Sequence, residues 1–83
     1  MKEDKAYQVC EYQEDLDDVD ETRSSSPAIA AQEYAERESA DWAHEDRSTL
    51  DVYVQESGKS ETRKKFVCVA HFEVRVVARE AEL

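Results

Sequence analysis

Hydrophobic and polar residues alternate most clearly in the second half of the 83-residue chain. In residues 49–55 the even positions are apolar, and the odd positions, ending with Gln55, are expected to face outward. Residues 66–79 alternate for longer, because every even position is apolar while most odd positions after Val69 are polar. Since most strands have roughly 3–10 residues, we expect one long strand with a bend or bulge around His71.

The first half of the chain adds a shorter strand. Residues 5–12 alternate so that Tyr7 and Val9 share one face, while Ala6 and Cys10 share the other. Between the two later strands stands the single glycine of the chain, Gly58, at a place where a hairpin turn requires a positive φ.

One helix is predicted after residue 26. Ser26 is suited to accept hydrogen bonds from the first turn, and Pro27 fits the first helical position because its missing N–H has no partner there. The helix is expected to end near residues 43–45. Helical spacing places four residues on its buried side, namely Ala31, Tyr34, Ala35 and Trp42.

These elements predict an α+β fold in a single domain of residues 1–83. The expected order is β-α-β-β, forming a three- or four-stranded antiparallel sheet with one helix packed on one face. A fourth strand would come from a short edge segment around residues 22–24.

The charge of the chain is unevenly distributed. Residues 1–47 contain 15 acidic and 5 basic residues, whereas residues 48–83 contain 6 of each, so the whole net charge of −10 belongs to the first half. This sign argues against binding to nucleic acid and to anionic membranes. It favours basic partners or a role in solubility. The amino-terminal ten residues lack the apolar core of a signal peptide, and no apolar run spans a bilayer, which predicts a cytoplasmic protein.

Residues 11–21, EYQEDLDDVDE, hold seven of the carboxylates. Like charges repel and no apolar period survives, so a solvated loop is expected, anchored by Leu16 and Val19. Counted from Asp15, the positions at which an EF-hand needs an acid, a glycine and a glutamate hold Val, Asp and Ser. A calcium site is therefore not predicted.

The chain offers no catalytic constellation. Cys68 and His71 point to opposite faces of a strand, and a chain with one glycine has no phosphate-binding loop. We therefore predict a protein that is not an enzyme and that uses no cofactor or metal. Cys10 and Cys68 are expected to be free thiols, with a disulfide as the alternative if their strands are neighbours.

Two binding hypotheses follow. In the first, spaced carboxylates mimic a phosphate backbone and occupy a basic groove of a protein that handles nucleic acid. The predicted partner-binding residues are Glu14, Asp15, Asp17, Asp18, Asp20, Glu21, Glu33, Glu36 and Trp42. In the alternative, the acids serve only solubility and the chain is a small dimeric adaptor. Val67 and Val69, exposed if the helix covers one face, would then form the self-association surface.

Residues 57–65 form the one basic segment. Lys59, Arg63, Lys64 and Lys65 are expected to protect the edge of the apolar strand that follows, or to pair with the acidic segment.

The stretches SSPAIAAQEYAERESADW, ESGKSETRKKF and VCVAHFEVRVVA, within residues 20–80, together resemble small acidic proteins encoded by phages and prophages. In that group a serine-proline-capped helix precedes a long hairpin, and some members are anti-CRISPR or anti-restriction inhibitors of host nucleases. The resemblance implies a phage-type inhibitor that acts in the host cytoplasm.

Overall fold

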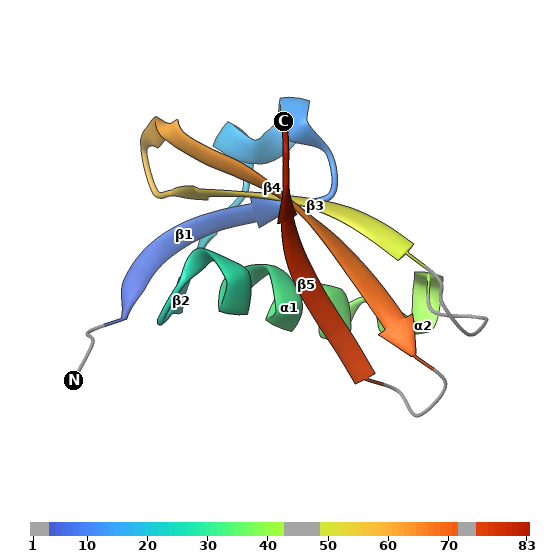
Figure 1. The fold of residues 1–83 in the computed structure, drawn as a ribbon. Helices are drawn as coiled ribbons and strands as arrows, with labels where there is room; N and C mark the ends of the chain where they lie inside the picture. The colour runs from blue at the N-terminus through green and yellow to red at the C-terminus, as the bar shows by residue number, and fades with distance from the viewer. Residues whose placement is uncertain (1–3, 43–48, 72–74) are drawn as a thin grey trace.

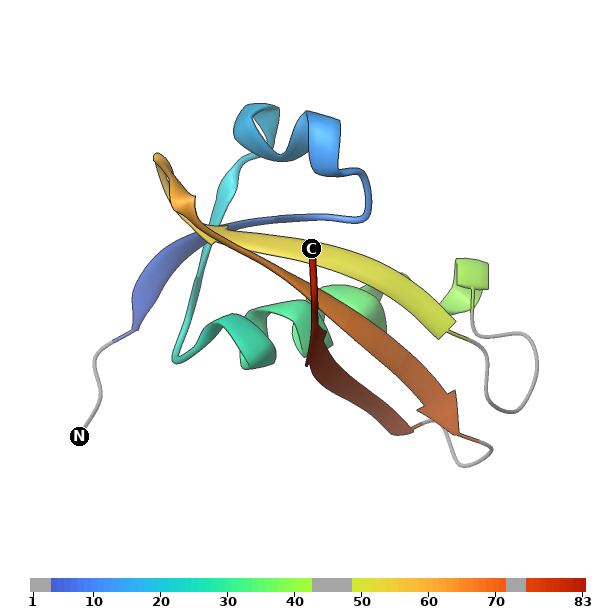
Figure 2. The same cartoon turned by 45° about the horizontal axis from the view of Figure 1, so that its top comes forward.

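The computed structural model describes residues 4–42, 49–71 and 75–83. Within these residues the chain forms a five-stranded antiparallel sheet in the order β2-β1-β3-β4-β5, with helices on both faces (Figures 1 and 2). The strands are β1 (Lys5–Cys10), β2 (Glu21–Ser24), β3 (Thr49–Glu56), β4 (Lys59–His71) and β5 (Arg75–Ala81). The helices are the 3₁₀ helix η1 (Gln13–Asp18) and the α-helices α1 (Pro27–Arg37) and α2 (Ser39–Trp42).

The α+β class and the antiparallel sheet with a helix on it are confirmed, but the expected strand number and order are wrong. The short edge strand exists as β2. The long alternating stretch is two neighbouring strands, β4 and β5, in place of one bent strand. Cys68 pairs with Ala78 across them, so the even positions of both strands share one face. Residues 72–74, Phe-Glu-Val, contain no glycine, proline, asparagine or aspartate, and therefore gave no turn signal.

Helix α1 begins as the sequence predicts. The Ser26 hydroxyl accepts a hydrogen bond from the backbone N–H of Ile29 at 3.2 Å, and Pro27 is the first helical residue. The helix ends at Arg37, where Glu38 leaves the helical conformation, and α2 follows. The Trp42 indole N–H donates to the carbonyl oxygen of Ala35 at 2.9 Å and so ties α2 to the last turn of α1. The expected end near residues 43–45 lies outside the described residues.

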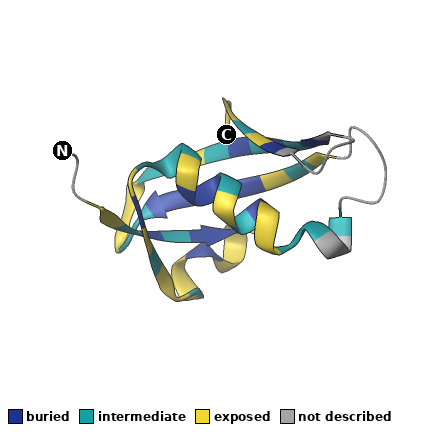
Figure 3. Ribbon diagram, turned by 90° about the horizontal axis from the view of Figure 1, so that it is seen from below, coloured by how far each residue is buried: buried dark blue, intermediate teal, exposed yellow. Residues whose placement is uncertain are grey.

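The main core lies between α1 and the sheet (Figure 3). Ala30, Ala31 and Ala35 are buried, and their small side chains let the helix backbone lie close to the strands. The strands contribute Tyr7, Val9, Val52, Val54, Phe66, Cys68 and Val76. The Gly58 hairpin is also confirmed, with a φ of 76°.

Both cysteines are buried free thiols, as expected. Val9 lies in the core beneath α1 and Cys10 follows it on the strand, so Cys10 faces the other side of the sheet from Cys68. The Cys68 thiol lies 3.8 Å from the carbonyl oxygen of Ala31, to which it donates. Burial, with a smaller contribution from Asp51, raises the pKa of Cys68 from 9.0 to about 11. Burial and the nearby Glu11 raise the pKa of Tyr34 from 10.0 to about 12.

These pKa shifts predict that the protein loses stability in alkali. Between the unfolded and folded pKa values of Cys68, 9.0 and about 11, the unfolded chain binds fewer protons, so its free energy falls relative to the folded state as pH rises. We expect a loss of about 2 kcal/mol across this range from the thiol. Urea unfolding at several pH values measures it. A Cys68→Ala variant should show a shallower slope, and an equal slope in both proteins would contradict the assignment.

None of the helices within the described residues has the length and apolar character needed to cross a membrane.

Candidate functional site

The acidic segment forms an ordered helix on the face of the sheet opposite α1 (Figure 2). The expectation of a loop is therefore wrong. Leu16 explains the order: its side chain is completely buried, whereas the residues around it are exposed. The predicted anchoring by Leu16 is confirmed, and Val19 is half-buried at the end of the helix. One fully buried leucine contributes about 1.5–3 kcal/mol towards holding this short helix against the strands.

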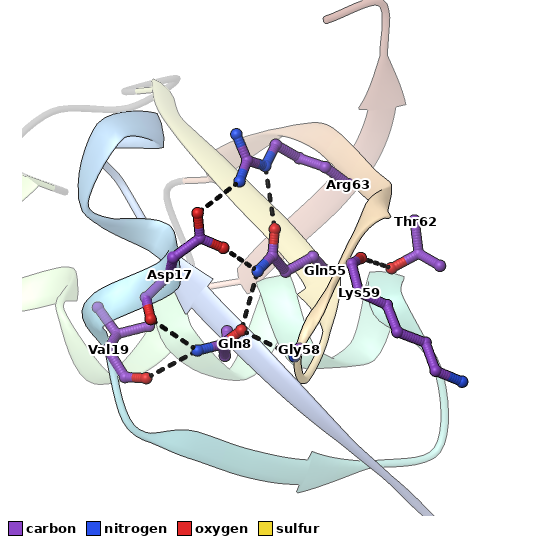
Figure 4. A network of polar contacts seen from close by, with 8 residues as sticks. All are labelled: Gln8, Asp17, Val19, Gln55, Gly58, Lys59, Thr62 and Arg63. Atoms are coloured by element: carbon purple, nitrogen blue, oxygen red, sulfur yellow. Dashed lines mark hydrogen bonds and ion pairs between the residues drawn. The ribbon is translucent and has the colours of Figure 1, made fainter.

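A buried glutamine fixes the position of η1 on the sheet (Figure 4). Gln55 was expected to face outward, but only 1% of it is exposed, because η1 covers it. Its amide nitrogen donates to the Asp17 carboxylate at 2.7 Å and to the Gln8 side-chain oxygen at 2.8 Å. Its amide oxygen accepts from the Arg63 guanidinium at 3.0 Å. All polar atoms of the Gln55 side chain are thus hydrogen-bonded, as burial requires.

Gln8 on β1 continues this network to the C-terminal end of η1. Its amide nitrogen donates to the backbone carbonyls of Asp17 and Val19, both at 3.2 Å. Its oxygen also accepts from the backbone N–H of Gly58 at 3.2 Å. These bonds satisfy carbonyl groups at the end of η1, where a helix leaves them without helical partners.

Arg63 on β4 supplies the charge that balances the network. Its guanidinium lies 3.4 Å from the second carboxylate oxygen of Asp17. The Arg63 side chain is 20% exposed and that of Asp17 is 67% exposed, so the pair is partly screened by solvent. Pairing of the basic segment with the acidic segment was one of the sequence expectations, and it is confirmed for this residue.

The network leaves most of the acidic segment free to face solvent. We call the exposed carboxylates of η1, together with that of Asp20 two residues after its end, the acidic ridge: Glu14, Asp15, Asp17, Asp18 and Asp20. Among the ion pairs of the described residues, Asp17 is the one ridge member involved. Tyr12, at the start of η1, is 55% exposed and adds an aromatic surface beside the ridge.

Of the remaining predicted partner-binding residues, Glu33, Glu36 and Trp42 lie away from the ridge, whereas Glu21 directly follows Asp20. Glu33 and Glu36 lie on α1, on the other face of the sheet, and the edge strand β2 connects the two regions. The Ser24 hydroxyl of β2 donates to Glu33 at 3.0 Å. Glu21 accepts from the Ser57 hydroxyl at 2.7 Å. Trp42 is half-buried, and its indole N–H is bonded to α1, so the structure does not bring it to the ridge.

The basic segment forms ion pairs with acidic residues of the same chain. Lys64 lies 3.4 Å from Glu80, and Lys65 lies 3.6 Å from Asp51. The apolar part of β4 that follows this segment is not a sheet edge, because residues 65–69 pair with both β3 and β5, whereas the pairs with β5 do not extend to residues 59–64. Sequence reasoning missed Gln8 and Gln55 as the residues that hold the ridge. A single glutamine in an alternating strand carries no signal that another segment will cover it.

No group of three potential metal ligands among His, Cys, Asp and Glu comes together in the part of the chain that the structure describes. Comparisons of the chain with protein families, with curated proteins and with solved structures found no match.

Proposed function

We propose that the protein is a non-enzymatic binding protein whose acidic ridge occupies a basic, nucleic-acid-binding surface of another protein. The observation that carries this proposal is the pinning of η1 by Leu16 and by the Gln8–Gln55–Asp17–Arg63 network. Exposed carboxylates that served only solubility would need no defined position. On this proposal the partner is a nuclease complex of a host cell, and the chain acts as an inhibitor of the phage type, such as an anti-CRISPR.

The electrostatics favour such a role. A net charge of −10 exceeds the magnitude of about 2–8 that keeps a small domain soluble. The negative potential of the ridge attracts a basic groove over a Debye length of about 8–10 Å. Because η1 is already ordered, binding does not have to order the carboxylates, and this lowers the entropic cost of association. Tyr12 supplies an aromatic contact of the kind that anchors protein interfaces.

The proposal predicts that reversing two ridge charges weakens partner binding. In an Asp15→Lys/Asp18→Lys variant both changed side chains are exposed, so we expect the fold to persist and the affinity to fall by about tenfold or more. Partners are captured on the immobilised protein from a bacterial lysate at two salt concentrations and are then titrated individually. Capture should weaken at the higher salt concentration, and a short DNA duplex should release the captured protein.

The matched control is an Asp4→Lys/Glu82→Lys variant. It has the same net charge, since each pair of reversals changes −10 to −6, but its substitutions lie at exposed positions near the two termini. It should bind nearly as well as the original chain. Equal affinity of both variants, or capture that DNA does not compete with, would overturn the proposal. Asp17 is unsuitable for this test, because its reversal would also break the network that orders η1.

A further inference from the structure

The face of the sheet that carries η1 is only partly covered. Helix η1 lies against β1 and β3, whereas in Figures 1 and 2 no described helix covers the corresponding side of β4 and β5. Three valines of β4 and β5 point to this open side. Val77 is 44% exposed, and Val67 and Val69 are half-buried. We call this surface, which lies beside η1, the open face.

The strand register arranges the open face in rows across β3, β4 and β5. One row is Asp51–Val67–Arg79, and the next is formed by Thr49, Val69 and Val77. Paired residues of antiparallel strands point to the same face, so each row runs across the open face. The first row therefore has a carboxylate on β3, an apolar residue in the middle and a guanidinium on β5. Asp51 and Arg79 are both exposed.

We infer that the open face binds a second copy of this chain in a two-fold symmetric dimer, with the axis running along β4. Such an axis places β3 of each copy opposite β5 of the other, and β4 opposite β4. Asp51 of each copy then meets Arg79 of the other, and the two Val67 side chains meet at the axis. Any row with opposite charges at its ends and an apolar centre is self-complementary under this rotation, as an isologous interface requires.

The neighbouring rows are compatible with the same arrangement. Val69 of the two copies meets at the axis, and Val77 of one copy faces Thr49 of the other. The third row places Lys65 at the axis, but its ammonium group lies 3.6 Å from Asp51 of its own chain and is partly neutralised there. The second copy's β5 would lie over Thr49 and Asp51 of β3, and both of these residues are exposed, so η1 does not cover this end of the strand.

The size of the open face sets the expected strength. A patch three strands wide and five residues long measures roughly 14 Å by 17 Å. This footprint of roughly 240 Å² per copy is below the range for stable specific interfaces, so we expect a weak dimer with a dissociation constant on the order of a hundred micromolar. This inference does not depend on the proposed function, because the ridge and the open face are formed by different residues.

Two single charge reversals and their mixture test the inference. Asp51→Lys and Arg79→Glu each create two like-charge contacts in the symmetric dimer. The dimer dissociation constant of each variant alone should therefore rise by about tenfold or more. In an equimolar mixture, a heterodimer of the two variants contains only opposite-charge pairs. Sedimentation velocity should therefore find the mixture dimeric at a concentration at which each variant alone is monomeric.

A Lys64→Glu/Glu80→Lys variant is the control, because it exchanges an ion pair of the same two strands on the α1 face. It should dimerise like the original chain. Thermal melting of every variant shows whether the fold persists. Asp51→Lys also places a like charge beside Lys65 of its own chain, but this effect is the same in the mixture and in the variant alone. Three outcomes would each overturn the inference. The original chain could remain a monomer at sub-millimolar concentration, or the mixture could stay monomeric. The single variants could also dimerise normally, which would indicate pairing through the β5 edge.

Discussion

Replacing Leu16 with alanine is expected to lower the free energy of unfolding by about 2–5 kcal/mol. Leu16 is the completely buried residue of η1, and no other member of that helix is buried. Its truncation removes apolar contacts with the sheet and leaves a cavity beneath a helix too short to be stable alone. For a domain of 83 residues this is a large part of the total stability. Urea unfolding followed by circular dichroism measures the change.

The same substitution should separate the ridge from the rest of the fold. Hydrogen exchange is expected to accelerate in residues 13–18 more than in β4, because the lost contacts are local to η1. Leu83→Ala is the matched control, since it removes the same atoms from a side chain that is 65% exposed, and it should change the free energy of unfolding by less than about 0.5 kcal/mol. Uniform acceleration throughout the sheet would show that η1 and the sheet unfold as one unit.

Replacing Gln55 with leucine is expected to destabilise the protein by about 2–4 kcal/mol, although the two side chains have similar volumes. The change removes one hydrogen-bond partner each from the Asp17 carboxylate, the Gln8 oxygen and the Arg63 guanidinium. Each lost bond costs stability, and bonds to charged groups cost the most. The free energy of unfolding, measured in urea, reports the loss.

A double-mutant cycle identifies the cause of that loss. Gln55→Leu and Asp17→Ala are combined, and their coupling energy is expected to be about 1–2 kcal/mol, because each substitution removes the same 2.7 Å hydrogen bond. Pairing Gln55→Leu with Glu82→Ala, at an exposed position, should give a coupling near zero. Additive effects for Gln55 and Asp17 would mean that the network does not act as a unit.

The sequence was sufficient where local chemistry decides the structure. The alternation in β3 and β4, the Ser26 cap and the positive φ of Gly58 each depend on a few neighbouring residues, and all are present. The β4–β5 connection failed because alternation continues in the same phase on both sides of residues 72–74. A bend in one strand and a reversal into a second strand then give the same apolar pattern.

The candidate site was predictable only in part. The exposed carboxylates of residues 14–20 were found from charge density alone. Their support was not, because Gln8, Gln55 and Arg63 meet Asp17 from three different strands. A 3₁₀ helix with one buried leucine also has no period long enough to be recognised in a sequence. Only the sheet order shows that this leucine has a surface to cover.

The sequence distance within the network has a consequence for biosynthesis. Asp17 bonds to Gln55 and Arg63 across 38 and 46 positions, so the ridge cannot reach its final arrangement on a ribosome before β4 has been translated. Until then the acidic segment lacks the hydrogen bonds to Gln55 and Arg63 that fix its position. A product truncated before β4 therefore keeps every carboxylate of the acidic segment but not the contacts that hold them in place.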